Sequence, residues 1–223
     1  MTKFNIAITS DNVCPWCYVG KNKLERGISL YKAAHPSSND TFTTTWLPFY
    51  LNPAAPKIGV DKLSYFKSRF GEEKASMIIE RLTAVGKDAG INFSFGGKTG
   101  NTRDSHRLLA FGKTKGAEVQ TRVVEELFKS YFEEEGDITS HDVLTEAGAR
   151  AGLEEAEVKN WLESGKGGEE VDKEVAEAQI RGVSGVPNFV LQGKYEIGGA
   201  QDAEAFVKVF ERVKEMEESL SGK

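Results

Sequence analysis

The chain has 223 residues, of which 39% are hydrophobic and 28% charged, a composition typical of a soluble globular protein with a substantial core. Its formal net charge of −5, without a basic stripe that carries interleaved aromatic residues, argues against nucleic acid as a partner. The longest apolar runs are far shorter than a bilayer span, so we expect no membrane partner either.

The first part of the chain has the pattern of a strand, a helix and a second strand. β-Rich residues alternate over residues 3–9, which predicts a strand, and apolar residues at helical spacing from Trp16 onward predict a helix. Residues 41–51 combine β-branched and aromatic residues in near alternation, which predicts a second strand that ends near Pro48. The prolines within residues 52–59 indicate a linker.

The middle of the chain is predicted to be helical. Apolar residues recur at helical spacing over residues 63–85, 102–111, 119–132, 140–151 and 154–162. Near the C-terminus the pattern changes to a helix over 171–180, a hairpin of strands at 188–191 and 195–197, and a last helix from Asp202.

This order of elements predicts how the chain is divided. A strand–helix–strand unit at the front and a hairpin with a helix at the back can join in one sheet, with the helical block inserted as a lid. We therefore expect an α/β domain formed by residues 1–58 and 171–223. An all-helical domain, residues 59–170, is inserted between its two parts.

Two cysteines, the only ones in the chain, frame the motif Cys14-Pro15-Trp16-Cys17. A strand, a CxxC motif and a helix in this order are typical of a redox dithiol. A structural disulfide here would close a very short loop and contribute little stability. A structural zinc site needs four ligands, and we expect no metal because the histidines are scattered, at His35, His106 and His141.

The predicted placement of the two cysteines favours thiolate chemistry. Cys14 lies just before the first helix and Cys17 lies in its first turn. Unpaired backbone N–H groups and the positive end of the helix dipole stabilise a negative sulfur at such a position. Pro15 suits the first helical position, where no backbone donor is needed.

Four motifs together resemble the DsbA-like branch of the thioredoxin superfamily, with the greatest similarity to its cytoplasmic FrnE-like members. They are CPWCYVGK at residues 14–21, NTRDSHRL at 101–108, GVSGVP at 182–187 and GGAQ at 198–201. The resemblance covers nearly the whole chain. It implies a thioredoxin fold with an inserted all-helical domain, and an activity of dithiol–disulfide exchange.

The resemblance also implies roles for individual residues. Cys14 matches the exposed nucleophilic cysteine and Cys17 the resolving cysteine. Val186 and Pro187 match a loop that lies against the CxxC motif, with a cis peptide bond before the proline. From the residues alone, Pro187 can equally be a proline at the start of a strand.

Four further residues are candidates for a role at the site. Pro15 and Trp16 are candidate substrate contacts, although an aromatic residue at this site can simply pack on the sheet. The best-known periplasmic oxidants carry a histidine where this chain has Trp16, which leaves the direction of electron flow open. His106 matches a segment that faces the cleft in the family, and it can also be a core histidine. Asn101 matches the same cleft-facing segment of the family, and it is also a candidate N-cap of the helix that follows.

We therefore expect a thiol–disulfide oxidoreductase that acts on a protein or a small-molecule thiol or disulfide. It needs no bound cofactor, and glutathione is a candidate reductant or co-substrate. The alternative is a glutathione-dependent isomerase or transferase of the 2-hydroxychromene-2-carboxylate isomerase and kappa-class glutathione transferase group, including a role in a polyketide pathway. A non-catalytic binding module is a third reading.

The start of the sequence lacks a basic region, an apolar stretch and a small-residue cleavage site. This favours a cytoplasmic location, where a disulfide is catalytic or transient.

Overall fold

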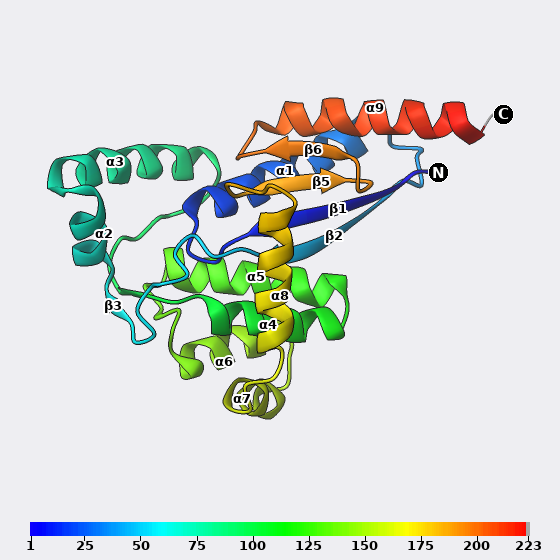
Figure 1. Cartoon of the computed structure of the whole chain (residues 1–223). Helices are drawn as coiled ribbons and strands as arrows, with labels where there is room; N and C mark the ends of the chain where they lie inside the picture. Colours follow the sequence, from blue (N-terminus) through cyan, green and yellow to red (C-terminus); the bar gives the residue numbers. More distant parts are fainter. Residues whose placement is uncertain (222–223) are drawn as a thin grey trace.

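The computed structural model describes residues 1–221, and its centre is a four-stranded sheet with the strand order β2-β1-β5-β6 (Figure 1). The strands are β1 (Lys3–Ser10), β2 (Thr41–Pro48), β5 (Asn188–Leu191) and β6 (Tyr195–Gly198). β1 and β2 are parallel, whereas β5 is antiparallel to both β1 and β6. The central strand β1 therefore pairs with the first and the last part of the chain, as expected for one sheet.

Helices α1 (Pro15–Ala34) and α9 (Ala203–Ser221) pack side by side against the sheet (Figure 1). Their close approach depends on Gly27, because a Cβ atom there would lie 2.9 Å from the Ala203 carbonyl oxygen and from the Phe206 Cβ. Phe206 and Phe210 of α9 are fully buried, and Phe210 contacts the ring of Phe4 from β1. These contacts join the two ends of the chain into one core.

A group of helices packs along the opposite side, beside β2 (Figure 1). They are α4 (Arg103–Thr114), α5 (Ala117–Phe132), α6 (His141–Arg150), α7 (Glu155–Glu163) and α8 (Gly168–Ile180). α5 lies against β2, where the side-chain amide of Gln120 accepts from the Trp46 N–H and donates to the Trp46 carbonyl oxygen, both at 3.0 Å. The amide thus takes the place of a neighbouring strand at this edge.

Two further helices, α2 (Lys62–Phe70) and α3 (Glu72–Asp88), form an arm that extends from the rest of the molecule (Figure 1). Gly71, with φ of 80°, ends α2 and starts α3, because this backbone conformation favours glycine. A two-stranded sheet of β3 (Val60–Asp61) and β4 (Lys98–Thr99) closes the base of the arm. We define α2 and α3 together as the α2–α3 arm.

The expected α/β fold, with helices inserted between its strands, is confirmed. β3 and β4 were not predicted, because two residues are too short to show a strand pattern. The division at residues 58 and 170 stays a prediction, and α8 contacts both α4 and β2.

Candidate active site

The CPWC motif forms the turn between β1 and α1. The Cys14 N–H donates to the Asp11 carbonyl oxygen at 3.0 Å, and the Cys17 N–H donates to the Cys14 carbonyl oxygen at 3.0 Å. Cys14 is the N-cap residue of α1, with Pro15 at its first position, so the predicted placement is confirmed. Both cysteines are free thiols. The sulfur of Cys14 thus lies at the positive end of a 20-residue helix.

The loop before β5 brings Val186 and Pro187 to this turn. Cys14 Sγ lies 3.6 Å from the Val186 carbonyl oxygen, although 172 positions separate the two residues, and the Val186–Pro187 peptide bond is cis. Gly20 of α1 makes the approach possible, because a Cβ there would lie 3.0 Å from Pro187 Cγ and 3.1 Å from the Phe189 ring. Pro187 directly precedes β5. It is therefore both a proline at the start of a strand and a proline of the loop that lies against the CPWC motif.

The two sulfur atoms differ in their surroundings. Cys17 is 1% exposed, and burial raises the pKa of its thiol well above the ordinary value, with a further rise from the neighbouring Cys14. The Ser10 hydroxyl and the Asp11 backbone N–H lower this pKa by smaller amounts. Burial therefore favours the protonated form of the Cys17 thiol. Cys14 is also buried, at 3% exposed, and not exposed as the family resemblance implies, because the Val186 loop and the turn cover it; it does, however, line a cavity.

This cavity has a volume of about 450 Å³ and lies between the CPWC turn and the α2–α3 arm. Cys14, Pro15, Trp16 and Val186 form one side, and apolar residues of the arm with aromatic residues of the following loop and α5 form the other. Four of the seven candidate residues predicted from the sequence therefore line the cavity. Two more, Cys17 and Pro187, are neighbours of these residues but do not line it.

Three cationic side chains of the arm also line the cavity: Lys62, Arg69 and Arg81. None of them forms an ion pair with an acidic side chain of the described residues. Lys62 is buried; its Nζ donates to the Tyr131 carbonyl oxygen at 2.6 Å, and burial lowers its pKa to about 8. Among the described lining residues, the one carboxylate is Asp11, which is itself fully buried. The cavity therefore combines apolar walls with an excess of positive charge.

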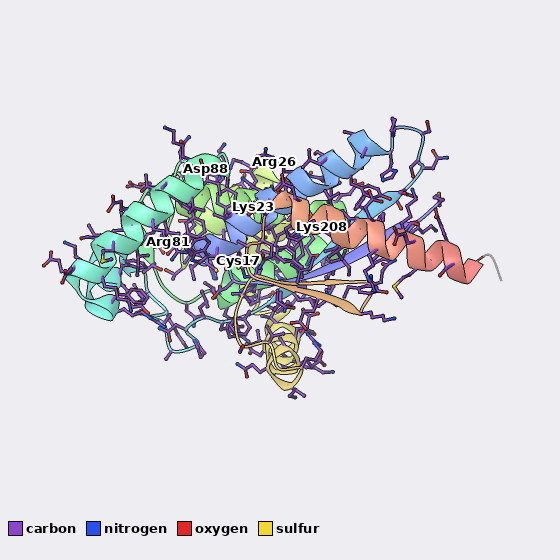
Figure 2. All side chains as sticks on the ribbon, turned by 90° about the horizontal axis from the view of Figure 1, so that it is seen from above. Cys17, Lys23, Arg26, Arg81, Asp88 and Lys208 are labelled. Carbon is purple, nitrogen blue, oxygen red and sulfur yellow. The ribbon has the colours of Figure 1, made fainter. Side chains whose placement is uncertain are left out.

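Arg81 connects the arm to the CPWC motif. Its guanidinium carbon lies 5.2 Å from the centre of the Trp16 ring, within the range of a cation–π contact. Figure 2 shows Arg81 on α3 and Cys17 on α1, from elements that face each other across this part of the molecule. Trp16 is half-buried and lines the cavity, so it both packs and remains within reach of a ligand.

His106 lies behind the cavity wall, not on it. It is 2% exposed, and its Nε2 atom lies 3.1 Å from the Phe49 carbonyl oxygen and 3.3 Å from Asp11 Oδ1. The structure therefore places this candidate in the core, in contact with the turn that precedes Cys14. Asn101 does not occupy the N-cap position of α4, which is Thr102, but its side-chain oxygen accepts from the Arg103 N–H at 3.0 Å.

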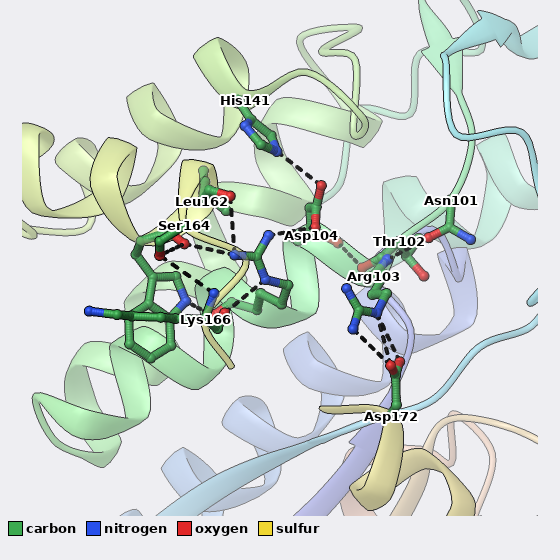
Figure 3. A network of polar contacts seen from close by, with 12 residues as sticks. Asn101, Thr102, Arg103, Asp104, His141, Leu162, Ser164, Lys166 and Asp172 are labelled. Atoms are coloured by element: carbon green, nitrogen blue, oxygen red, sulfur yellow. Dashed lines mark hydrogen bonds and ion pairs between the residues drawn. The ribbon is translucent and has the colours of Figure 1, made fainter. Parts of the chain in front are cut away.

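A network of polar contacts holds α4, and with it His106, in place (Figure 3). Arg107 is 2% exposed, and its guanidinium donates to the carbonyl oxygens of Trp161, Leu162 and Lys166. Asp104 bridges Arg107, at 2.7 Å, and His141, at 2.9 Å. These contacts fix the end of α7 on α4, so Arg107 supports the position of the helix and not the chemistry of the sulfur atoms.

Within residues 1–221, no group of three or more His, Cys, Asp or Glu side chains has the arrangement of a metal site. No helix of this part of the chain has both the length and the apolar character needed to cross a bilayer.

Comparisons with known proteins agree with the geometry of the site. The sequence model of the DSBA-like thioredoxin domain matches residues 5–211. The curated protein YwbO of Bacillus subtilis (strain 168), which is described as uncharacterized, is 26% identical over 210 residues, which cover 92% of this chain and 94% of that protein.

Solved structures give the same result. The crystal structure of the probable DsbA oxidoreductase SCO1869 from Streptomyces coelicolor superposes with a TM-score of 0.81 at 28% identity, over 92% of this chain and 88% of the other. A 2-hydroxychromene-2-carboxylate isomerase has a TM-score of 0.66 at 16% identity, over 97% and 98% of the two chains. The cytosolic disulfide reductase DsbM of Pseudomonas aeruginosa, solved with GSH, has a TM-score of 0.64 at 14% identity, over 95% and 99%. The last two similarities show a common fold alone.

Proposed function

Because this chain belongs to the family of DSBA-like thioredoxin domains, we propose that it exchanges disulfides through Cys14 as nucleophile and Cys17 as resolving thiol. The observation that carries the proposal is the different placement of the two sulfur atoms. Both cysteines are buried, but Cys14 stands at the N-cap of α1, beside the Val186 carbonyl oxygen, and lines the cavity, whereas Cys17 does not line it. The finer assignment to the FrnE-like group stays a prediction.

The reaction starts when the Cys14 thiolate attacks one sulfur of a substrate disulfide. The new bond joins Cys14 to that sulfur, the substrate S–S bond breaks, and the other substrate sulfur leaves as a thiolate. The Cys17 sulfur, once deprotonated, then attacks Cys14 Sγ and displaces the second substrate thiolate. The substrate gains two electrons, and the protein loses two in forming the Cys14–Cys17 bond. With a dithiol substrate the same steps run in reverse.

The surroundings of Cys14 support the first step. The sulfur lies at the N-terminus of α1, where the helix dipole favours negative charge. The Val186 carbonyl oxygen, which now accepts from the Cys14 thiol, is an available acceptor for the backbone N–H of an extended substrate.

The test is insulin reduction with dithiothreitol, followed together with the reduction potential of the Cys14–Cys17 pair. We expect catalysed precipitation of the insulin B chain and a single two-electron redox equilibrium. Thiol titration of the denatured protein first establishes that both cysteines are reduced. If such a sample reduces neither insulin nor a small disulfide, the proposal is contradicted.

Glutathione is the co-substrate that the cavity favours. It carries two carboxylates, and Lys62, Arg69 and Arg81, which form no ion pair within the described residues, supply cations around a cavity that includes Cys14. Reduction of the Cys14–Cys17 disulfide by glutathione, followed by the release of oxidised glutathione, tests this role.

The same cationic cavity favours one second candidate function, a glutathione-dependent isomerase or transferase. In this case glutathione supplies the reacting sulfur, so the replacement of Cys14 by serine leaves activity largely intact. An oxidoreductase loses all activity with the same substitution. An assay of glutathione conjugation and of isomerisation on both proteins separates the two functions.

We also propose that the protein acts in the cytoplasm. Its two cysteines are both in the CPWC motif, so no further disulfide supports the fold, and such usage is typical of a reducing compartment. Rapid acid quenching of cells followed by thiol alkylation measures the redox state of the pair. We expect mostly dithiol if the protein acts as a reductase.

A further inference from the structure

The α2–α3 arm carries apolar side chains that no described part of the chain fully covers. Lys62 is the one buried residue of α2, and three of the 17 residues of α3 are buried. Five apolar residues of the arm are only half-buried, and all of them line the cavity: Leu63, Phe66, Phe70, Ile78 and Ile79. Contiguous apolar surface that water can reach marks a binding site. The arm therefore has the character of one half of such a site.

The residues across the cavity are apolar as well. Phe93 and Phe95 of the loop before β4, Phe132 of α5 and Trp16 of the CPWC motif all line it. The cavity volume of about 450 Å³ lies within the range of pockets that hold small molecules, about 300–1,000 Å³. Aromatic rings in contact gain free energy beyond that of the area they bury. The cavity thus fits a small apolar ligand, and an aromatic one best.

Lys62 supplies a cation at the base of the arm. It is the first residue of α2, and its Nζ atom donates to the Tyr131 carbonyl oxygen at 2.6 Å and lies 3.9 Å from the centre of the Tyr131 ring. An ammonium group has three N–H donors, and this is its one hydrogen bond within the described residues. Glu135 raises the pKa of Lys62 but forms no ion pair with it and accepts from the Ser94 hydroxyl instead. Two donors are left for a ligand.

The other charges around the cavity also favour an anion. Arg69 and Arg81 line it and form no ion pair within the described residues. Asp11, the one carboxylate among the described lining residues, already accepts from the Leu51 N–H at 2.8 Å and lies 3.3 Å from His106 Nε2. An occupant that satisfies the whole cavity therefore has an apolar body and an anionic group.

We propose that the preferred substrate is a small disulfide of an aromatic thiol that carries a carboxylate. The substrate sulfur lies at Cys14, the ring against the arm, and the carboxylate pairs with Lys62. The inference rests on the proposed dithiol function and names its substrate. Glutathione disulfide has a polar backbone, so it satisfies the cations but leaves the apolar walls uncovered.

The reaction balances as in the proposed exchange. The Cys14 thiolate displaces one aromatic thiolate, and Cys17 then displaces the other from Cys14 as its proton passes to solvent. The substrate gains two electrons, and the protein loses two in forming the Cys14–Cys17 bond. A low-molecular-weight thiol, with glutathione as the candidate, restores the dithiol.

Four matched disulfides separate the effect of the ring from that of the charge. They are the disulfides of mercaptonitrobenzoate and of mercaptopropionate, each as the acid and as its amide. Fully reduced protein is mixed with each one, and acid quenching, alkylation and mass spectrometry follow the formation of the Cys14–Cys17 bond. Each rate constant is divided by that of the same disulfide with mercaptoethanol, because the leaving thiols differ in pKa. We expect the acid to exceed its amide roughly tenfold, and the ring to exceed propionate roughly tenfold.

Variants of the arm test the assigned contacts. Lys62→Met keeps an apolar side chain and removes the charge, so the ratio of the acid to the amide should fall towards one. Lys74→Met, at an exposed position of α3 outside the cavity, should keep the ratio of the unaltered protein. Phe66→Ala should reduce the preference for the ring over propionate. An equal fall of the acid-to-amide ratio in Lys62→Met and Lys74→Met would assign it to net charge and overturn the pairing.

The unaltered protein alone decides the substrate class if a variant does not fold. Ratios near one for both the charge and the ring would overturn the inference. A larger normalised rate constant with the disulfide of an extended apolar peptide would also overturn it, in favour of a protein substrate. If no disulfide oxidised the dithiol faster than it oxidises mercaptoethanol, the proposed function itself would be contradicted.

Discussion

The two walls of the cavity differ in how they are held. On one side, α1 carries the dithiol, and eight of its 20 residues are buried against the sheet and α9. On the other, α3 belongs to the α2–α3 arm, and three of its 17 residues are buried. The sulfur atoms thus lie on the rigidly packed wall, and the cations Arg69 and Arg81 lie on the exposed one. We infer that the packed wall performs the reaction and the arm selects the substrate.

The largest expected effect comes from the sulfur atoms of the packed wall. Cys14→Ser should abolish insulin reduction, because no nucleophile remains at the cavity. Cys17→Ser should keep the first attack and accumulate mixed disulfides, which mass spectrometry detects after acid quenching. Both variants should fold, since a crosslink over so short a loop contributes little stability. Trapping by Cys14→Ser and not by Cys17→Ser would reverse the roles.

The next largest effect concerns the stability of the fold around α1 and α9, where Asp40 is held. The carboxyl group of Asp40 accepts from the Thr2 N–H at 2.6 Å, the Tyr31 hydroxyl at 2.8 Å and Lys214 Nζ at 3.0 Å. Burial raises the pKa of Asp40, but these contacts and one with Ser38 outweigh it and hold the pKa well below the ordinary value. Asp40→Asn should lower the free energy of unfolding by roughly 2 kcal/mol, measured in urea at neutral pH.

The sign of the accompanying pH dependence follows from the lowered pKa. Asp40 contributes its stability above the pKa of the unfolded state, about 3.9, and loses it as pH falls further through the folded value. Unfolding free energies measured between pH 5 and pH 2 should therefore converge for the Asp40→Asn variant and the unaltered protein. If the difference in unfolding free energy between the two proteins stayed constant with pH, the lost stability would come from altered packing and not from the charge of Asp40.

A smaller effect is expected from the arm. Lys62→Gln should raise the Michaelis constant for oxidised glutathione roughly tenfold, because it removes a buried cation that a carboxylate can pair with. The turnover number should change little. Since the pKa of Lys62 is about 8, the affinity of the unaltered protein should fall as pH rises through this value. Lys74→Gln, an exposed change on α3, is the control. If Lys62→Gln and Lys74→Gln had equal Michaelis constants for oxidised glutathione, the Lys62 cation would have no role in binding it.

The smallest effect concerns the contact between the walls. Arg81→Gln removes the cation over the Trp16 ring, a contact worth about 0.5–1 kcal/mol at exposed sites. A double-mutant cycle with Trp16→Leu, which removes the aromatic face, should give a coupling free energy of this size in urea unfolding. Trp16 fluorescence should also shift towards that of a more hydrated indole. Zero coupling would mean that the arm moves independently of the CPWC turn.

The dithiol wall could be predicted from the sequence because its signals are local. A CxxC motif after a strand and before a helix fixes where Cys14 lies in the turn, and the resemblance to a known family adds Pro187 from a distant part of the chain. The structure agrees on both positions. The spacing of the two cysteines and the motifs shared with the family were therefore sufficient to predict the positions of Cys14 and Pro187.

The cations of the α2–α3 arm and the contact between Asp11 and His106 could not be predicted in the same way. Lys62 and Arg81 belong to different helices with ordinary polar patterns, and they share a cavity only because Gly71 turns the chain between them. Likewise, Asp11 and His106 are 95 positions apart, and their contact depends on how Arg107 fixes α4. Such juxtapositions arise from packing, which no periodicity of the sequence records.

The pairing of Gln120 with Trp46 has a consequence for the protein in contact with other chains. β2 is an edge strand, and an open edge recruits extended segments of other molecules and so starts aggregation. The Gln120 amide occupies the N–H and the carbonyl oxygen that such a segment would need, and α5 shields the strand beside it. On this side of the sheet, the Trp46 backbone is therefore closed to an extended segment of another chain.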